Sequence, residues 1–216
     1  MRTSFDEQLS LLNRRLIEMG ALCEDAIAAS MRAMAEEPKA AEKTKNIECE
    51  IDHAEREIEA LCMKLLLQQQ PVARDLRAIS SALRMISDME RIGDQASDIA
   101  EIMRYIPDDD IAGATHLNAM AKAARRMVTS SVDSFVRRDL GLARQVQEDD
   151  DAVDTLFDTV RQELVARIRK EPSRGGECLD LLMVAKYLER IGDHAVNVAE
   201  WVEFVRTGRY HNENLF

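Results

Sequence analysis

A twelve-residue block that occurs twice constrains the fold of this chain of 216 residues more than any other feature. Residues 90–101 read ERIGDQASDIAE, and residues 189–200 read ERIGDHAVNVAE, an offset of 189 − 90 = 99 positions. The ERIGD pentad and three of the positions after it are identical, so eight of the twelve match. Such a repeat indicates internal duplication, and we expect two similar halves folded into one compact body.

Helical periodicity, interrupted at the prolines, divides each half into three helices. Gly (8) and Pro (4) are scarce, and the hydrophobic residues (46%) are mostly aliphatic, since aromatic residues account for 4%. This composition favours helices, and proline falls at their ends because it lacks an N–H donor. The predicted helices span residues 4–36, 39–69, 73–104, 115–137, 140–170 and 175–206.

We therefore predict an all-α fold of two pseudo-symmetric three-helix bundles, with no strand. Residues 1–106 form the first repeat, residues 115–216 the second, and residues 107–114 a polar linker between them. The duplication extends to the second helix of each half, where residues 50–58 align with residues 152–160 at an offset of 152 − 50 = 102. The internal repeat is therefore larger than the pentad.

Charge, apolar run length and cysteine spacing exclude several classes of protein. A formal net charge of -11 argues against a nucleic-acid partner, because phosphate contacts require clustered Lys and Arg. The longest apolar runs are too short to cross a bilayer, and the N-terminal residues lack a signal-peptide core, so we expect a cytoplasmic protein without membrane insertion. The cysteines show no Cys-x-x-Cys spacing and are expected to be free, buried thiols.

The repeated block places carboxylates along one face of a helix. At about 100° per residue, positions four apart are rotated by only about 40°, so acids at such spacing form a stripe beside the apolar face. In the first half the stripe contains Glu90, Asp94 and Asp98, and in the second half Glu189, Asp193 and Asn197. Asn197 keeps an oxygen that could bind a cation but lacks the charge of Asp98.

The preceding helix of each half supplies a second acidic pair with the same spacing. These pairs are Glu48 with Asp52, and Asp150 with Asp154. Asp52 lies 71 − 52 = 19 residues before Pro71, and Glu90 lies 90 − 71 = 19 residues after it. Residues equidistant from the turn of an antiparallel helical hairpin lie at the same height, so the two pairs can face one another. The second hairpin has nearly the same register around Pro172.

Four carboxylates brought together would repel and raise each other's pKa values unless a cation shares them. Oxygen-rich clusters suit Mn, Fe, Mg, Ca or Zn. Gly93 and Gly192 each cost their helix about 1 kcal/mol relative to Ala, and a bare backbone there permits close approach of a helix or a metal. The competing interpretation is a set of solvated helix faces neutralised by Arg91, Arg190 or Lys186.

These motifs, together with QPVARDLR at residues 70–77 and YLERIGDHAVNVAE at residues 187–200, resemble the PhoU family of phosphate transport regulators. The likeness covers nearly the whole chain. It implies iron or zinc ions or clusters bound by (Glu/Asp)-x-x-x-Asp pairs, with manganese as a further candidate. Carried over, the pairs are Glu48 with Asp52, Glu90 with Asp94, Asp150 with Asp154, and Glu189 with Asp193. Asp150 in place of a Glu, and Asn197 opposite Asp98, lead us to expect unequal affinities.

The resemblance also implies a role without catalysis. Such a protein would repress the phosphate-starvation response by linking a phosphate ABC transporter, through its ATPase subunit, to a sensor histidine kinase, and it would be a homodimer. Two alternatives remain. Glu50-x-x-His53 matches one of the two elements that a carboxylate-bridged di-metal redox enzyme needs, and a metal-free helical adaptor needs neither. His194 lies about 140° from Glu189 around the helix, so we expect a surface or supporting role for it.

Overall fold

Long helices follow one another along the part of the chain that the structure describes, which comprises residues 2–32, 38–69, 71, 73–106, 115–210 and 213–214 of this computed structural model. They are α1 (Arg2–Arg32), α2 (Pro38–Gln69), α3 (Ala73–Met103), α5 (Thr115–Arg137), α6 (Leu140–Lys170) and α7 (Gly175–Thr207). The all-α prediction is confirmed. The predicted linker, residues 107–114, and the predicted end of the first helix, residues 33–36, lie outside the described residues.

Two short elements complete the described chain. A turn of 3₁₀ helix, η1 (Pro172–Arg174), joins α6 to α7, and strands β1 (Arg209–Tyr210) and β2 (Glu213–Asn214) pair antiparallel after α7. The expectation of no strand therefore fails at this two-residue pair. The reason is physical: a pair this short has no alternation of polar and apolar residues that a sequence could show.

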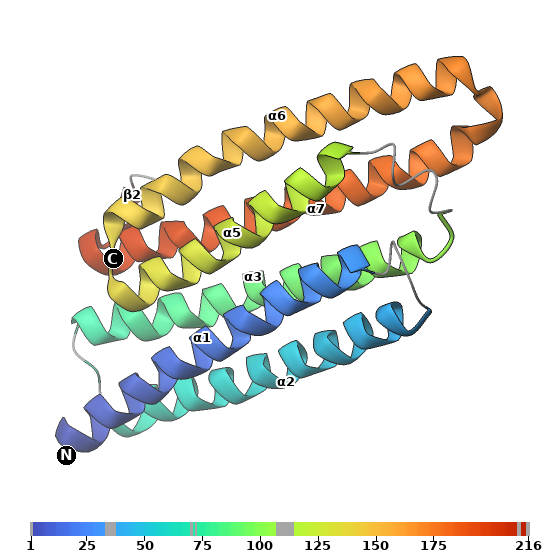
Figure 1. Ribbon diagram of the computed structural model, residues 1–216. Coiled ribbons are helices and arrows are strands. Elements are labelled where there is room, and N and C mark those ends of the chain that lie inside the picture. Colours follow the sequence, from blue (N-terminus) through green and yellow to red (C-terminus); the bar gives the residue numbers. More distant parts are fainter. Residues whose placement is uncertain are drawn as a thin grey trace.

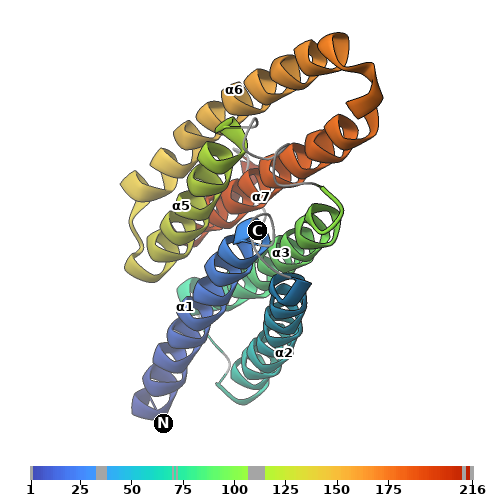
Figure 2. The same cartoon turned by 45° about the vertical axis from the view of Figure 1, so that its right-hand side comes forward.

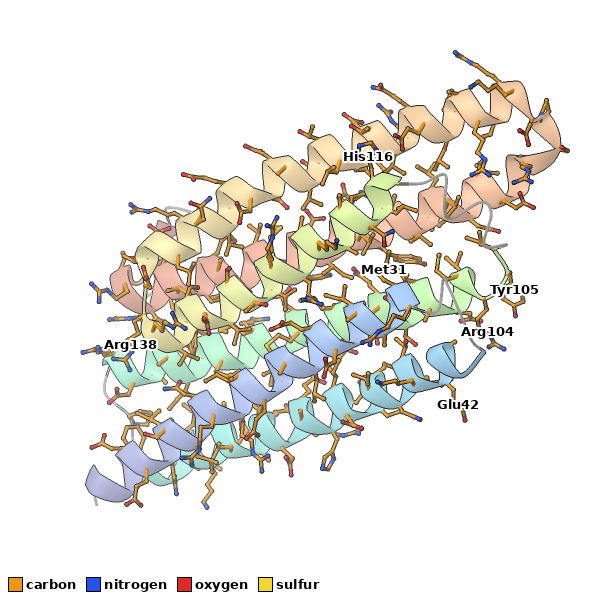
Figure 3. The ribbon with its side chains drawn as sticks, in the orientation of Figure 1. Met31, Glu42, Arg104, Tyr105, His116 and Arg138 are labelled. Carbon is orange, nitrogen blue, oxygen red and sulfur yellow. The ribbon has the colours of Figure 1, made fainter. Side chains whose placement is uncertain are left out.

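The sharp connection between α5 and α6 depends on two adjacent residues. Arg138, labelled in Figure 3, takes a left-handed backbone with φ 56°, and it reverses the chain direction. The Asp139 carboxylate then accepts hydrogen bonds from the backbone N–H groups of Gly141 and Leu142 at 2.9 and 3.1 Å. Asp139 is thus the N-cap of α6, and it satisfies two N–H groups that the first turn leaves unpaired.

The halves lie against each other through their third helices. α3 and α7 run side by side in the middle of the molecule, while α2 and α6 lie on its outer edges (Figures 1 and 2). α1 and α5 also touch across the two halves. Buried residues from all the long helices form one hydrophobic core, which includes the predicted apolar face of α3, with Met89, Ile92 and Ile99 at 0% exposure.

None of the described helices has the length and apolar character needed to cross a membrane. The acidic positions of α2, α3, α6 and α7 lie beside the core rather than within it. The fold therefore presents two hairpins, α2–α3 and α6–α7, each with carboxylates on both helices.

Candidate metal centres

The first carboxylate cluster joins α2 to α3. The pKa of Glu48 is raised by burial and then by the negative charges of Asp52 and Asp94. The pKa of Glu90 is raised by burial and then by Asp94, with a smaller contribution from Asp52 across the hairpin. The carboxylates of the two helices therefore repel one another across the hairpin.

A guanidinium already sits beside this first cluster. Arg91 Nη1 lies 3.2 Å from Asp94 Oδ2, and Arg91 Nε lies 3.5 Å from Glu90 Oε2. The Arg91 side chain is 62% exposed, so water screens these ion pairs and they contribute at most about 1 kcal/mol each. Arg91 therefore offsets part of the repulsion between the carboxylates of this cluster.

The second cluster lies between α6 and α7, and it contains the carboxylate with the largest rise in pKa, Asp150. Burial, followed by the charges of Asp193 and Asp154, raises the pKa of Asp150 to about 6. The pKa of Asp193 is also raised, first by burial and then by Glu189, while Lys186 lowers it. Lys186 Nζ forms an ion pair with Glu189 Oε2. Asp150 Oδ1 is buried and has no hydrogen-bond partner in the described part of the chain.

The glycines of the two pentads serve different neighbours. A Cβ added at Gly93 would lie 2.8 Å from Cδ1 of Ile51, a buried side chain of α2, so this glycine allows the two helices to approach closely. A Cβ added at Gly192 would instead lie 3.2 Å from Asp150 Oδ1. The bare backbone of Gly192 therefore makes space for the carboxylate oxygen that lacks a partner.

Two further residues of the predicted stripes form hydrogen bonds with the other half. Asp98 accepts a hydrogen bond from the Tyr187 hydroxyl, which lowers a pKa that burial raises. The side-chain N–H of Asn197 donates to Asp88 Oδ1 across 3.1 Å. At the offset of 99, position 88 corresponds to 187 and position 98 to 197, so these two contacts are equivalent under the pseudo-symmetry. Both contacts join α3 to α7.

His194 completes this contact between the halves. Its Nδ1 lies 2.9 Å from Asp88 Oδ1, the oxygen that Asn197 also approaches. His194 therefore supports the α3–α7 contact. Asp88 and Tyr187 were not identified from the sequence as polar contacts. The signal that could have found them is their equivalence at the repeat offset, on the side of each helix opposite to the hairpin.

Replacing Asp88 by alanine should destabilise the protein by about 2 kcal/mol, because it leaves His194 and Asn197 without their acceptor in a half-buried contact. Urea unfolding monitored by circular dichroism measures this difference. Asp25→Ala provides the matched control, since Asp25 is exposed on α1. Equal unfolding midpoints for the two variants would show that the Asp88 contact does not hold the halves together.

The eight carboxylate side chains of the four acidic pairs are oxygen ligands of the kind that hard or borderline cations prefer. One of their oxygens, Asp150 Oδ1, is buried and has no hydrogen-bond partner among the described residues. Within the ranges that the structure describes, no three His, Cys, Asp or Glu side chains are arranged as a metal-binding group. A role in metal binding stays a prediction for the residues of the four acidic pairs and for two further stripe residues. They are Glu48, Asp52, Glu90, Asp94, Asp150, Asp154, Glu189 and Asp193, together with Asp98 and Asn197.

Comparison with known proteins relates the chain to phosphate transport proteins. It is 33% identical over 209 residues to the phosphate-specific transport system accessory protein PhoU homolog of Rhizobium meliloti, covering 95% of this chain and 88% of that protein. The corresponding homolog of Clostridium acetobutylicum is 33% identical over 213 residues, with 96% of each chain covered.

Solved structures and the family model agree with these relatives. The crystal structure of PhoU from Pseudomonas aeruginosa superposes with a TM-score of 0.87 at 31% identity, covering 95% of this chain and 100% of that one. The PhoU protein of Streptococcus pneumoniae, at 23% identity and a TM-score of 0.86, shares the fold. The PhoU domain model matches residues 16–103 and 117–202, one match for each half. With both halves matched, the chain belongs to the PhoU family.

Proposed function

We propose that this protein is a non-enzymatic, cytoplasmic negative regulator of phosphate uptake and of phosphate-starvation signalling. The observation that carries this proposal is the match of nearly the whole chain to accessory proteins of the phosphate-specific transport system. An accessory protein acts by contact with its transporter. We therefore assign the regulatory effect to surfaces of this helical body and to the ions that it binds.

The proposed partners are the ATPase subunit of a phosphate ABC transporter and a sensor histidine kinase, with the protein itself a homodimer. Exposed apolar side chains near both hairpin turns support a role in protein contacts, because water-exposed apolar groups of this size favour burial against a partner. They are Met63, Leu67 and Leu76 on the first hairpin, and Val165, Leu179 and Met183 on the second.

Each hairpin would hold iron, zinc or manganese between its acidic pairs. The physical support is that burial, followed by the negative charge of neighbouring carboxylates, raises the pKa values of Glu48, Glu90, Asp150 and Asp193. A cation bound there would neutralise charges that now repel one another across the hairpin. Asp150 and Asp193 would be ligands of the second site, where the unpartnered Asp150 oxygen favours tighter binding than in the first.

A metal-free helical adaptor is the second candidate, and the ion pairs of Arg91 and Lys186 favour it. Arg91 already pairs with Glu90 and Asp94, and Lys186 already pairs with Glu189. In this case the clusters would be solvated faces that contact partners through their charge. The candidates differ in one respect that can be measured, namely the metal content of the purified protein.

The test combines genetics with metal analysis. Deleting the gene should derepress phosphate uptake, and wild-type protein should restore control; normal phosphate control in the deletion strain would contradict the regulatory role. The Asp94→Ala and Asp193→Ala double variant should purify with sharply less metal by mass spectrometry, whereas an Asp25→Ala and Asp180→Ala double variant should keep the wild-type amount. Unchanged metal in the first variant would favour the adaptor. Copurification then identifies the partners.

A further inference from the structure

A pocket of about 320 Å³ lies between α1 and α5, the first helices of the two halves. It is lined from α1 by Ile27, Ala28, Met31 and Arg32, and from α5 by Asn118, Ala121, Lys122 and Arg125. Figure 3 labels Met31, which lies in the last turn of α1 on the side of the molecule where α5 begins. The pocket is distant in sequence from both acidic hairpins and spans the two halves.

The charge of this pocket is opposite to that of the protein. The net charge is -11, but Arg32, Lys122 and Arg125 line the pocket, and among the residues that the structure describes no acidic side chain does. None of these three cations forms an ion pair with a carboxylate among the described residues. Arg32 Nε donates to the Ala28 carbonyl oxygen across 3.1 Å, which holds this guanidinium at the pocket edge with its other N–H groups available.

Distant carboxylates do not cancel this local charge. At physiological ionic strength the Debye length is about 8 Å, so charges farther away are largely screened and the groups at the pocket decide what binds there. A guanidinium binds two phosphate oxygens with its planar fork, and a lysine ammonium adds a compact charge. Phosphate is therefore the anionic group that these three side chains suit.

The other residues that line the pocket are mostly apolar, which favours a ligand larger than an inorganic anion. Ile27 is 1% and Ala121 is 6% exposed, and with Ala28 and Met31 they form an apolar wall. An apolar wall favours a ligand with an apolar or aromatic part, and the pocket volume falls at the small end of the range of about 300–1,000 Å³ found for small-molecule sites. Asn118 can accept and donate hydrogen bonds at the same site.

We propose that this pocket binds a phosphate ester with an apolar or aromatic organic part, nucleoside monophosphates being the simplest class. The phosphate would lie against Arg32, Lys122 and Arg125, and the organic part against the wall formed by Ile27 and Met31. Since the pocket spans α1 and α5, such a ligand would strengthen the contact between the halves. This site goes beyond the proposed regulatory function and does not depend on the carboxylate clusters.

Calorimetric titration of the full chain at physiological ionic strength tests the assignment. The probes are AMP, inorganic phosphate, which lacks the organic part, and adenosine, which lacks the phosphate. We expect AMP to bind about tenfold or more tightly than either single component, because both sets of contacts contribute. No binding of AMP at millimolar concentration, or equal binding of AMP and inorganic phosphate, would overturn the proposal.

Matched variants locate the site. Lys122→Gln combined with Arg125→Gln should weaken AMP binding about tenfold or more, whereas Arg126→Gln, the exposed neighbour outside the pocket, should leave it within about twofold. Ala28→Leu fills the apolar side without changing charge and should weaken AMP but not inorganic phosphate. Thermal unfolding confirms that each variant folds. Equal losses of AMP binding in the Lys122→Gln and Arg125→Gln double variant and in Arg126→Gln, or displacement of AMP by a glutamate-rich peptide, would contradict a phosphate-ester site.

Discussion

Replacing Gly93 with leucine is expected to destabilise the protein by about 3 kcal/mol. Even a single added carbon at this position would lie 2.8 Å from Cδ1 and 3.3 Å from Cγ2 of Ile51, whose side chain is 0% exposed and cannot move into solvent. A leucine adds three more heavy atoms and would push α2 away from α3. The gain in helix propensity, about 1 kcal/mol, offsets only part of this cost.

Urea unfolding measures the effect as a fall in the midpoint at unchanged slope. Gly176→Leu is the matched control: Gly176 lies in the first turn of α7, and a Cβ added there has no atom within 4 Å. We expect this control to be as stable as the wild type or slightly more stable. If both leucine variants unfold at the wild-type midpoint, Gly93 does not set the spacing between α2 and α3.

Changing Asp150 to asparagine should raise the stability of the metal-free protein and lower that of the metal-bound protein relative to the wild type. Burial and the neighbouring carboxylates raise the pKa of Asp150 from 3.8 to about 6 in the folded protein. The folded state thus binds this proton more tightly than the unfolded chain, so the group favours folding at acidic pH. That contribution is lost as the pH rises from about 4 to about 6, and at neutral pH the ionised carboxylate destabilises the fold.

Without metal, Asp150→Asn should therefore be more stable than the wild type near neutral pH by about 1–2 kcal/mol, and equally stable near pH 4. The expected gain is smaller than the full pKa shift implies, because water still reaches part of the Asp150 side chain and screens its charge. Urea unfolding at several pH values in the presence of a chelator provides the measurement. A variant that is less stable than the wild type at neutral pH would contradict this electrostatic account.

With Mn²⁺ or Zn²⁺ in excess, the order should reverse. A free metal concentration of one hundred times Kd would stabilise the wild type by about 2.7 kcal/mol, and the neutral amide should lose most of this gain because it is a weaker ligand. Asp151→Asn makes the same change at the exposed neighbouring residue, and this variant should keep the stabilisation by metal. Equal metal stabilisation of the wild type and Asp150→Asn would remove Asp150 from the proposed ligands.

Much of the fold could be predicted from the sequence, because prolines mark the ends of helices and the internal duplication indicates two similar halves. The predicted and observed bounds of α5 and α6 coincide, since residues 138–139 and 171–172 interrupt helical periodicity on both sides. Asp52 and Glu90 are equidistant from Pro71 and could be expected at the same height, because a hairpin of two straight helices leaves little freedom in height. The final strand pair gave no such signal.

The candidate site could be predicted less completely, because a helix has more than one neighbour. Asp98 lies about 80° around α3 from Glu90, which turns it from α2 towards α7, and a single-helix projection does not say where the next helix lies. Asn197 follows the same geometry on α7. Likewise, Gly93 and Gly192 occur in identical pentads, yet one faces Ile51 and the other Asp150. Only the packing of distant segments distinguishes them.

The paired hydrogen bonds between α3 and α7 obey the rule of an isologous interface. In a twofold symmetric dimer, residue i of one subunit meets residue j of the other, and j meets i. Here position 88 meets the counterpart of 98, and position 98 meets the counterpart of 88, although both sides belong to one polypeptide. A true homodimer must carry every substitution on both sides at once. Covalent fusion removes that restriction, which allows Asp88 and Tyr187, or Asp98 and Asn197, to diverge while each contact is kept.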